Sequence, residues 1–269
     1  MEYRRLIHFF GLKRSGNHAI QNWISHQIPE PIAVYNNHTT TASFRVTKAE
    51  DLNAPSLHTG SFGGNESLMY TYEDYPLRGA NHAQPLTPEE FRGLGDFDEV
   101  TNIILLRDPF NNLCSRVRSS LNNDPLTPVP LRLYDPFRKL WVLYAKEVQG
   151  ETSYLFDESV TPMTKVSILY NKWFTDQEYR KEISKKLGLE FNDNGLQYVN
   201  DFGFGSSFDK KNYQGNAQAM KVNERWKQMM EGKPARNLMK KLRADSELMH
   251  SVEALFPDIY KEIIEEKGL

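Results

Sequence analysis

The chain has 269 residues, of which 39% are hydrophobic and 25% are charged, a composition typical of a globular protein rather than a disordered or fibrous one. Its 33 basic and 35 acidic residues give a formal net charge of −2, which excludes a general electrostatic attraction to nucleic acid or to an anionic membrane. An anion site in this protein must therefore be local.

The single cysteine, Cys114, excludes an internal disulfide and a thiolate zinc site, and it favours the reducing cytoplasm. No stretch approaches the roughly 20 apolar residues of a membrane helix, so we expect no membrane insertion. The length favours one domain spanning residues 1–269.

Short apolar runs alternate with segments of helical periodicity along the chain. The predicted strands cover residues 6–11, 32–35, 67–72, 100–106 and 165–170. The predicted helices cover 16–27, a short segment from residue 87, 108–121, 136–148 and 176–187, followed by two or three C-terminal helices broken at Pro234 and Pro257. Residues 36–66, 122–130 and 192–216 are expected to be mostly loop. This order predicts an α/β fold with a central, mainly parallel sheet flanked by helices, a P-loop-like three-layer sandwich, and a helical C-terminal part.

A glycine-containing loop, residues 11–18, joins the first predicted strand to the first predicted helix. Backbone N–H groups and the positive end of a helix attract an anion at such a junction, and Lys13 and Arg14 add fixed positive charge. The alternative is an ordinary strand-to-helix turn that carries exposed basic residues.

Gly11 and Gly16 have the spacing of the two glycines of a Walker A loop. A nucleoside triphosphatase needs Lys and then Ser or Thr after the second glycine, because the hydroxyl holds Mg²⁺. Asn17 and His18 stand at these two positions, so the loop suits an anion better than a magnesium-bound triphosphate.

A second basic position ends the most continuous apolar strand, 100–106. Arg107 follows it directly, at the edge where α/β sheets bind ligands, and Ser115 lies two helical turns further on. The serine hydroxyl can thus reach the same anion as the arginine. The alternative is a surface arginine capped by Asp108 and a serine that faces solvent.

These motifs resemble those of the sulfotransferases that use PAPS, 3′-phosphoadenosine 5′-phosphosulfate. The family's 5′-phosphosulfate loop has Lys or Arg followed by Ser-Gly, as in Arg14-Ser15-Gly16, and then Thr or Ser where this chain has Asn17 and His18. The family's strand, Arg-x-Pro and Ser at +8 match Arg107, Pro109 and Ser115.

The resemblance continues toward the C-terminus in the same order. The family's Arg-Lys-Gly-x-x-Gly loop is similar to residues 210–215, which keep Lys210, Lys211 and Gly215 and have Asn212 at the first glycine. The family's flanking residues and late strand and helix are matched by Phe208, Arg225-Trp226, 168–170 and 187–189.

The resemblance implies transfer of the sulfuryl group from PAPS to an acceptor hydroxyl, with adenosine 3′,5′-bisphosphate as product and no metal ion. The residues implied to bind PAPS are Lys13, Arg14, Ser15, Gly16, Asn17, His18, Arg107, Ser115, Lys210, Lys211 and Gly215. Arg14 would also act in catalysis, as a fixed charge beside the departing 5′-phosphate.

The catalytic base implied by the resemblance is Glu73, which directly follows strand 67–72, at the place where cytosolic members of the family have His and Golgi members have Glu. A partly desolvated carboxylate at the edge of a sheet suits this role, although Glu73 could also be a solvated strand end. His58 is the competing base, and His18 is a third candidate, better suited to donate to a phosphate.

Two other functions stay open at this point. The glycine spacing also fits a P-loop kinase-like phosphotransferase. The departures from the family at Asn17, His18, Asn212 and Ala19, where cytosolic members have Trp, also fit a non-catalytic nucleotide-binding protein. The polar composition of 36–66 and 122–135 suits a carbohydrate or another small hydroxylated acceptor, but an anionic or lipid acceptor is equally allowed. No partner beyond the acceptor, and no oligomeric state, is indicated.

Overall fold

The structure is a computed structural model of the chain. It describes residues 4–35, 45–47, 56–57, 67–76, 96–123, 133–153, 164–197, 199, 208–209, 212–230 and 233–269. The predicted helix from residue 87 lies outside these ranges, as does His58.

Seven strands of the described chain form one sheet in the order β4-β3-β2-β5-β1-β6-β7. The parallel strands are β1 (Arg5–Gly11), β2 (Ile32–Tyr35), β5 (Ser67–Glu73), β6 (Glu99–Leu106) and β7 (Thr164–Leu169). Two short strands, β3 (Arg45–Thr47) and β4 (Ser56–Leu57), add an antiparallel edge. They lie in a segment expected to be mostly loop, because runs of two or three residues are too short to show a strand period.

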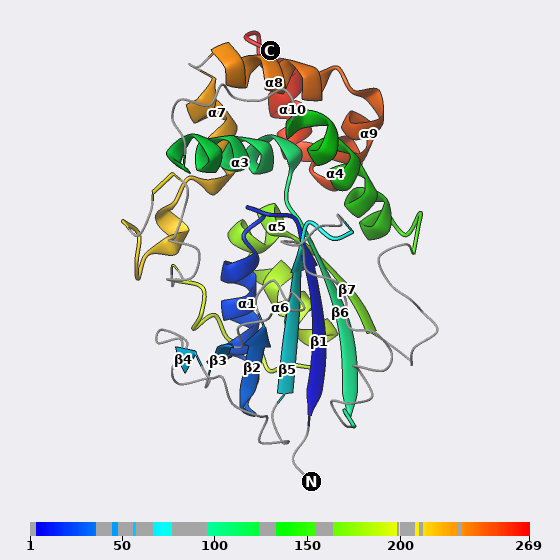
Figure 1. The fold of residues 1–269 in the computed structure, drawn as a ribbon, viewed down its shortest axis with the longest axis vertical. Coiled ribbons are helices and arrows are strands. Elements are labelled where there is room, and N and C mark those ends of the chain that lie inside the picture. The colour runs from blue at the N-terminus through cyan, green and yellow to red at the C-terminus, as the bar shows by residue number, and fades with distance from the viewer. Residues whose placement is uncertain are drawn as a thin grey trace.

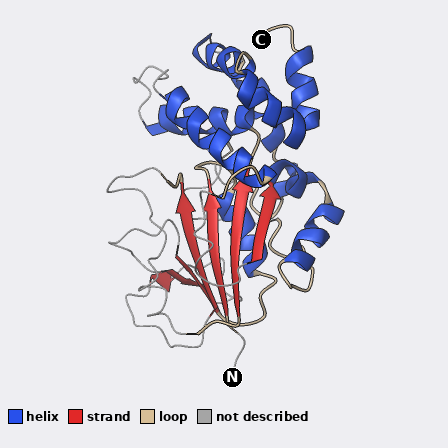
Figure 2. Cartoon of the chain, turned by 90° about the vertical axis from the view of Figure 1, so that its right-hand side faces the viewer, coloured by secondary structure: helices blue, strands red, loops and turns tan. Residues whose placement is uncertain are grey.

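The helices are α1 (Asn17–Ser25), α3 (Pro109–Asn123), α4 (Tyr134–Gln149), α5 (Tyr170–Thr175), α6 (Gln177–Lys186), α7 (Arg225–Met229), α8 (Lys233–Arg243), α9 (Ser246–Leu255) and α10 (Pro257–Glu265). Figure 1 shows α3, α4 and α7–α10 gathered beyond one end of the sheet. Figure 2 shows the arrowheads of the strands pointing toward this helical part. None of the described helices is long and apolar enough to cross a membrane.

Alternating side chains of the strands build a core on each face of the sheet. Ile7 and Phe9 of β1 pack in one core with residues of α1 and α6, such as Trp23. Leu6 and Phe10 face the other way, into a core shared with α3, α4 and α8–α10. The predicted fold, a mainly parallel sheet flanked by helices with a helical C-terminal part, is confirmed.

The boundaries of several helices differ from the prediction. Tyr170, predicted to end a strand, begins the short helix α5. Within 225–230 and 233–269 the chain forms four helices rather than two or three. Pro234 and Pro257 lie in the first turns of α8 and α10, where proline is tolerated because the first N–H groups of a helix need no partner. The missed boundary is at Asp245, whose side chain caps α9 by accepting from the N–H of Leu248 at 3.1 Å.

The sheet register brings three strand ends to one place. Gly11, the last residue of β1, pairs with Glu73 on one side and with Leu105 on the other. The segments that follow β1, β5 and β6 therefore leave the sheet side by side, beneath the helical part.

Candidate anion-binding active site

The loop between β1 and α1 is folded as a cradle of backbone N–H groups. The N–H of Ser15 closes a turn onto the carbonyl of Leu12 at 3.1 Å, and Arg14 and Gly16 have left-handed φ values of 65° and 93°. The N–H groups of Arg14, Gly16 and Asn17 hydrogen-bond to none of the described residues. Successive N–H groups in such a turn, next to a helix N-terminus, form a site for an anion.

Both glycines of this loop are required by close contacts, and Gly16 is also required by its left-handed backbone. A Cβ on Gly11 would lie 2.0 Å from Oδ1 of Asn17. A Cβ on Gly16 would lie 2.1 Å from Cε2 of Tyr170, a buried side chain at the start of α5. The ring of Tyr170 therefore packs directly against Gly16, and any side chain at position 16 would overlap this ring.

Two side chains outside the loop fix its backbone. Asp74 accepts from the N–H of Lys13 at 2.9 Å and forms an ion pair with Arg116 of α3. Asn112, also on α3, donates to the carbonyl of Lys13 at 3.1 Å and to Oγ of Ser15 at 3.0 Å. The hydroxyl of Ser15 thus faces α3, while the ammonium of Lys13 forms no ion pair with the described residues.

Arg107 lies beside this loop and is buried, with 5% of its surface exposed. Its Nη1 donates to the carbonyl of Arg14 at 3.1 Å and to Oγ of Ser115 at 3.3 Å, and its Nη2 donates to the carbonyl of Val222. Its guanidinium carbon lies 5.1 Å from the centre of the Tyr170 ring. The alternative of a surface arginine does not describe this side chain.

Arg107 forms no ion pair with any residue that the structure describes. Its hydrogen-bond acceptors are two carbonyls and a hydroxyl, and its buried Nε has no partner among the described residues. Burial lowers the pKa of Arg107, and the neighbouring Tyr170 and Asp108 oppose this effect, but an arginine stays charged in proteins. A buried cation next to neutral groups favours the binding of an anion.

Asp108, although adjacent in sequence, is used elsewhere. Its carboxylate accepts from the N–H of Asn111 at 2.8 Å, from the side-chain amide of Asn111 at 2.9 Å and from that of Asn171 at 2.8 Å. It therefore caps the N-terminus of α3 and joins that helix to α5.

Two serine hydroxyls of α3 accept hydrogen bonds from Arg107 and Arg14. Ser115 lies against Arg107, and Ser119, one helical turn later, accepts from Nη2 of Arg14 at 2.6 Å. Burial lowers the pKa of Arg14, and the nearby Glu73 opposes this effect. Sequence analysis found Ser115 and missed Ser119, although the i, i+4 spacing of the two serines was a usable signal.

Glu73 is joined to the loop by Asn17. Nδ2 of Asn17 donates to Oε1 of Glu73 at 2.7 Å and to the carbonyl of Leu12 at 3.1 Å. The structure therefore places the proposed base beside the anion loop. His18 is half-buried in the first turn of α1.

Only part of the late loop is described. Arg225 is buried, forms an ion pair with Asp209 and lies 4.6 Å from the ring centre of Phe208. The adjoining carbonyls of Val222 and Asn223 accept from Arg107 and from Asn111, which places this segment next to the strand end. Lys210 and Lys211 lie outside the described residues.

Not every expected residue joins the cluster. Gly215 lies at φ 77° and has no hydrogen bond to the loop or to Arg107 in the described structure. The residues that the structure does bring together are Lys13, Arg14, Ser15, Gly16, Asn17, Glu73, Arg107 and Ser115. The supporting residues that sequence analysis missed are Asp74, Asn112, Ser119 and Tyr170.

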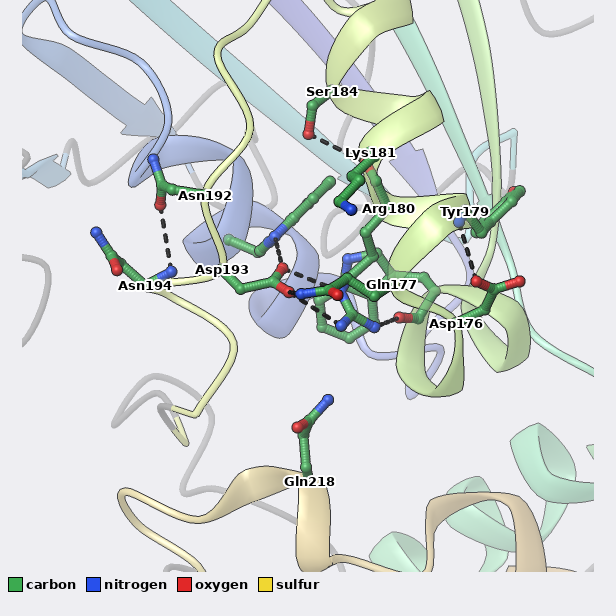
Figure 3. Close-up of polar contacts among 12 residues, drawn as sticks. Asp176, Gln177, Tyr179, Arg180, Lys181, Ser184, Asn192, Asp193, Asn194 and Gln218 are labelled. Atoms are coloured by element: carbon green, nitrogen blue, oxygen red, sulfur yellow. Dashed lines mark hydrogen bonds and ion pairs between the residues drawn. The ribbon is translucent and has the colours of Figure 1, made fainter.

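A second polar cluster, at α6, has a structural role. Figure 3 shows Arg180 and Gln177 of this helix directed at Asp193. Arg180 is buried and donates to both oxygens of Asp193 at 3.0 Å, and Nε1 of Trp23 also donates to Asp193 at 3.0 Å. Because these charges neutralise one another, the cluster holds the segment after α6 against α1 and is no ligand site.

No protein-family model matches the chain, and no curated protein sequence matches it either. Three similar solved structures are all sulfotransferases, the family that the sequence motifs resemble. The mouse sulfotransferase SULT7A1 complexed with PAP is 13% identical, covers 98% of this chain and 90% of its own, and has a TM-score of 0.45. The sulfotransferase domain from the curacin biosynthetic pathway is 12% identical, with 95% of this chain and 98% of its own covered and a TM-score of 0.38. A sulfotransferase from Alicyclobacillus acidocaldarius is 15% identical, with 96% of this chain and 99% of its own covered and a TM-score of 0.44. These identities and TM-scores do not indicate a function; the residues of the anion site do.

Proposed function

We propose that this protein is a sulfotransferase that moves the sulfuryl group of PAPS to an acceptor hydroxyl. The observation that supports this most strongly is Arg107, a buried guanidinium that has neutral hydrogen-bond acceptors and lies directly beside the anion loop. A buried charge is costly unless a counter-ion accompanies it. Two adjacent anion sites, one at the loop and one at Arg107, suit a nucleotide with phosphates at two positions.

The residues present fit such a nucleotide. The N–H groups of Arg14, Gly16 and Asn17, which hydrogen-bond to no residue in the described part of the chain, would hold the 5′-phosphosulfate together with the side chains of Lys13 and Arg14. Arg107, whose Nε is buried without a partner in the described structure, would hold the 3′-phosphate together with Ser115. We further propose that Lys210, Lys211 and Gly215 close over the 3′-phosphate, and that Ser15, Gly16, Asn17 and His18 complete the loop site.

The chain's own residues supply the proton transfer and the charge stabilisation. PAPS, when bound, would supply the sulfuryl group. Glu73 accepts the proton of the acceptor hydroxyl as the oxygen of that hydroxyl bonds to sulfur. Arg14 stabilises the negative charge that remains on the 5′-phosphate oxygen when its bond to sulfur breaks. Because Arg14 does not give up a proton, its role is electrostatic.

Two observations count against a magnesium-dependent phosphotransferase. The side chain after Gly16 is the amide of Asn17, which is already bonded to Leu12 and Glu73, and neither Asn17 nor His18 has a hydroxyl for Mg²⁺. A non-catalytic nucleotide-binding protein would share the anion site, and only turnover distinguishes it.

The acceptor is proposed to be a small hydroxylated molecule or a carbohydrate, and the location to be the cytoplasm. The second point follows from the single cysteine. Cys114 is buried, and burial raises the pKa of its thiol, so this thiol is inert rather than poised for disulfide formation.

A thermal-shift assay tests the proposed function. Adenosine 3′,5′-bisphosphate without Mg²⁺ should stabilise the protein by about 2.7 kcal/mol at a concentration of 100 Kd, whereas Mg-ATP should give less. Radiolabelled PAPS should then transfer its label in a screen of sugars and small phenols. Stabilisation by Mg-ATP alone would favour the phosphotransferase, and binding without any turnover of PAPS would favour the non-catalytic protein.

A further inference from the structure

We propose that Asn17 is a positioning residue that holds the carboxylate of Glu73 for proton transfer, an inference that rests on the proposed function. Asn17 is the first residue of α1 and is buried, with 4% of its surface exposed. Its Nδ2 donates to Oε1 of Glu73 at 2.7 Å and to the carbonyl of Leu12 at 3.1 Å. One amide thus joins the candidate base to the backbone of the anion loop.

The orientation of this amide is set by its neighbours. Both groups on the Nδ2 side, the Leu12 carbonyl and the Glu73 carboxylate, are acceptors, so a flipped amide would place an oxygen against two oxygens. The amide of Asn17 is therefore oriented with Nδ2 toward Glu73, and it donates to that carboxylate. The hydrogen bond fixes the position of Oε1 of Glu73 relative to the loop.

The oxygen of the same amide is left without a hydrogen bond from the described residues. Oδ1 of Asn17 is buried and has no hydrogen-bond partner among the described residues. It is directed at Gly11, where a Cβ would come within 2.0 Å of it. An unpaired buried acceptor lowers the stability of the fold. The orientation of the amide is thus unfavourable at Oδ1, and its benefit lies in the hydrogen bond that positions Glu73.

The backbone of Glu73 is already fixed without Asn17. Glu73 ends β5 in register with Gly11, and the following residue, Asp74, is held by its N–H to the carbonyl of Gly11 at 3.1 Å and by its carboxylate to Lys13. Asn17 therefore acts on the side chain of Glu73 rather than on the strand. Its loss should move the carboxylate while leaving the loop and the sheet in place.

A double-mutant cycle of Asn17→Ala and Glu73→Gln tests this inference. PAPS turnover is measured with phenol, which keeps its proton at neutral pH, as acceptor and with water alone, and the Kd of adenosine 3′,5′-bisphosphate is measured by calorimetry. Asn17→Ala should lower kcat by about 100-fold, the typical cost of a misplaced catalytic group. It should change the Kd by less than about 3-fold, because the side chain of Asn17 is bonded to Leu12 and Glu73 and the backbone N–H that would face the nucleotide is kept in alanine. In the Glu73→Gln background it should change kcat by less than about 3-fold, because the two residues act as a unit.

Asn22→Ala is the matched control. Asn22 is a buried asparagine of the same helix that donates to the carbonyl of Gly195 at 3.0 Å, so this variant reports the general cost of losing a buried amide from α1. It should keep kcat within about 3-fold of the parent. Asn17→Ser, which keeps a small polar side chain that is too short to reach Glu73, repeats the test if Asn17→Ala does not fold.

Several results would overturn the inference. They are full turnover in Asn17→Ala and Asn17→Ser, independent losses in the double variant, or a large loss of nucleotide affinity with kcat retained. Those results leave the proposed function standing, because the parent protein still turns over PAPS. The proposed function itself fails, and the inference with it, if the parent does not bind adenosine 3′,5′-bisphosphate or binds it without ever turning over PAPS.

Discussion

At the scale of single residues, the proposed sulfuryl transfer depends most on Glu73. Its carboxylate lies where β5 leaves the sheet, bonded to Asn17 and close enough to Arg14 to oppose the lowering of that arginine's pKa. A carboxylate there can take the proton of a hydroxyl directed at the anion loop. The neighbouring Asp74 is unsuited to this role, because it is committed to Arg116 and to the backbone of Lys13.

Glu73→Gln separates catalysis from binding. Glutamine keeps an oxygen to which Asn17 can donate but cannot accept the proton, so kcat for PAPS turnover should fall by about 10²–10⁴-fold. The Kd of adenosine 3′,5′-bisphosphate should stay within about 3-fold of the parent value. His58→Gln is the comparison, and it should keep its turnover. Unchanged turnover in Glu73→Gln, with a loss in His58→Gln, would move the role of base to His58.

A buried histidine in β1 predicts how stability depends on pH. His8 is enclosed by aromatic rings, and its Nδ1 lies 3.1 Å from the hydroxyl of Tyr72. Burial lowers the pKa of His8 from 6.5 to about 4. The unfolded chain therefore binds a proton at a higher pH than the folded one, and stability falls as the pH drops from about 6.5 toward 4, by about 3 kcal/mol in all.

Urea unfolding at pH 7.5 and at pH 4.5 measures this effect. His8→Phe should remove most of the difference between the two free energies of unfolding, because no proton is taken up on unfolding at this position. His250→Gln, a change at an exposed histidine of α9, should keep the difference. An equal pH dependence in the parent and in His8→Phe would show that other groups cause it.

At the scale of elements, the turn from β1 to α1 is fixed by its neighbour α5. Gly16→Ala would place a methyl group 2.1 Å from the ring of Tyr170 in a left-handed backbone. The expected loss of stability is about 2–5 kcal/mol, from overpacking and strain together, with weaker binding of adenosine 3′,5′-bisphosphate. Gly150→Ala is the control, since φ there is 77° and nothing lies within 4 Å of the new Cβ. It should cost only about 1 kcal/mol, and equal losses in urea unfolding would show that the Tyr170 contact is unimportant.

The carboxylate of Asp193 joins the segment after α6 to Arg180 and to Trp23 of α1. Asp193→Ala would leave the buried guanidinium of Arg180 without its counter-ion, which typically costs about 3–5 kcal/mol. Lys181→Ala, which removes an exposed pair with Glu178 on the same helix, should cost less than about 0.5 kcal/mol. Similar free energies of unfolding for the two variants would contradict this account of the cluster.

Elements with strong local patterns were predictable from the sequence. The continuous apolar run before Arg107 indicated a central parallel strand, and β6 is one. The helix α5 was not predictable, because Tyr170 continues the apolar run of β7 in the sequence. The contact between its ring and Gly16, at the start of α5, joins parts of the chain that are far apart in sequence. The boundary at Asp245 was missed because the two prolines of the C-terminal region were interpreted as helix ends when they begin helices.

The same distinction applies to the site. The basic loop residues and Arg107 with Ser115 stand out in sequence by spacing and by their place after strands. Ser119 is indicated only by its i, i+4 spacing from Ser115. Asp74 and Asn112 do not stand out at all, because each contacts the loop from a distant part of the chain. Such contacts arise from the packing of α3 and β5 around the loop, which no local pattern encodes.

At the scale of the whole molecule, a near-neutral chain concentrates positive charge at one place. The net charge is −2, yet Arg14 and Arg107 lie together at the carboxyl end of the sheet, both without carboxylate hydrogen-bond partners in the described structure. This arrangement suits a small, doubly phosphorylated ligand better than a polyanion. We also propose that residues 1–269 form one domain, since one core runs from β1 and β5 into α8–α10.

The most direct test of this account compares two nucleotides by calorimetry without Mg²⁺. The parent protein should bind adenosine 3′,5′-bisphosphate at least about 10-fold more tightly than adenosine 5′-phosphate. Arg107→Met should remove this preference and leave the affinity for adenosine 5′-phosphate nearly unchanged, whereas Arg138→Met, a change on α4 at the ion pair with Asp245, should keep it. Equal losses of affinity for both nucleotides in Arg107→Met would contradict the assignment of Arg107 to the 3′-phosphate.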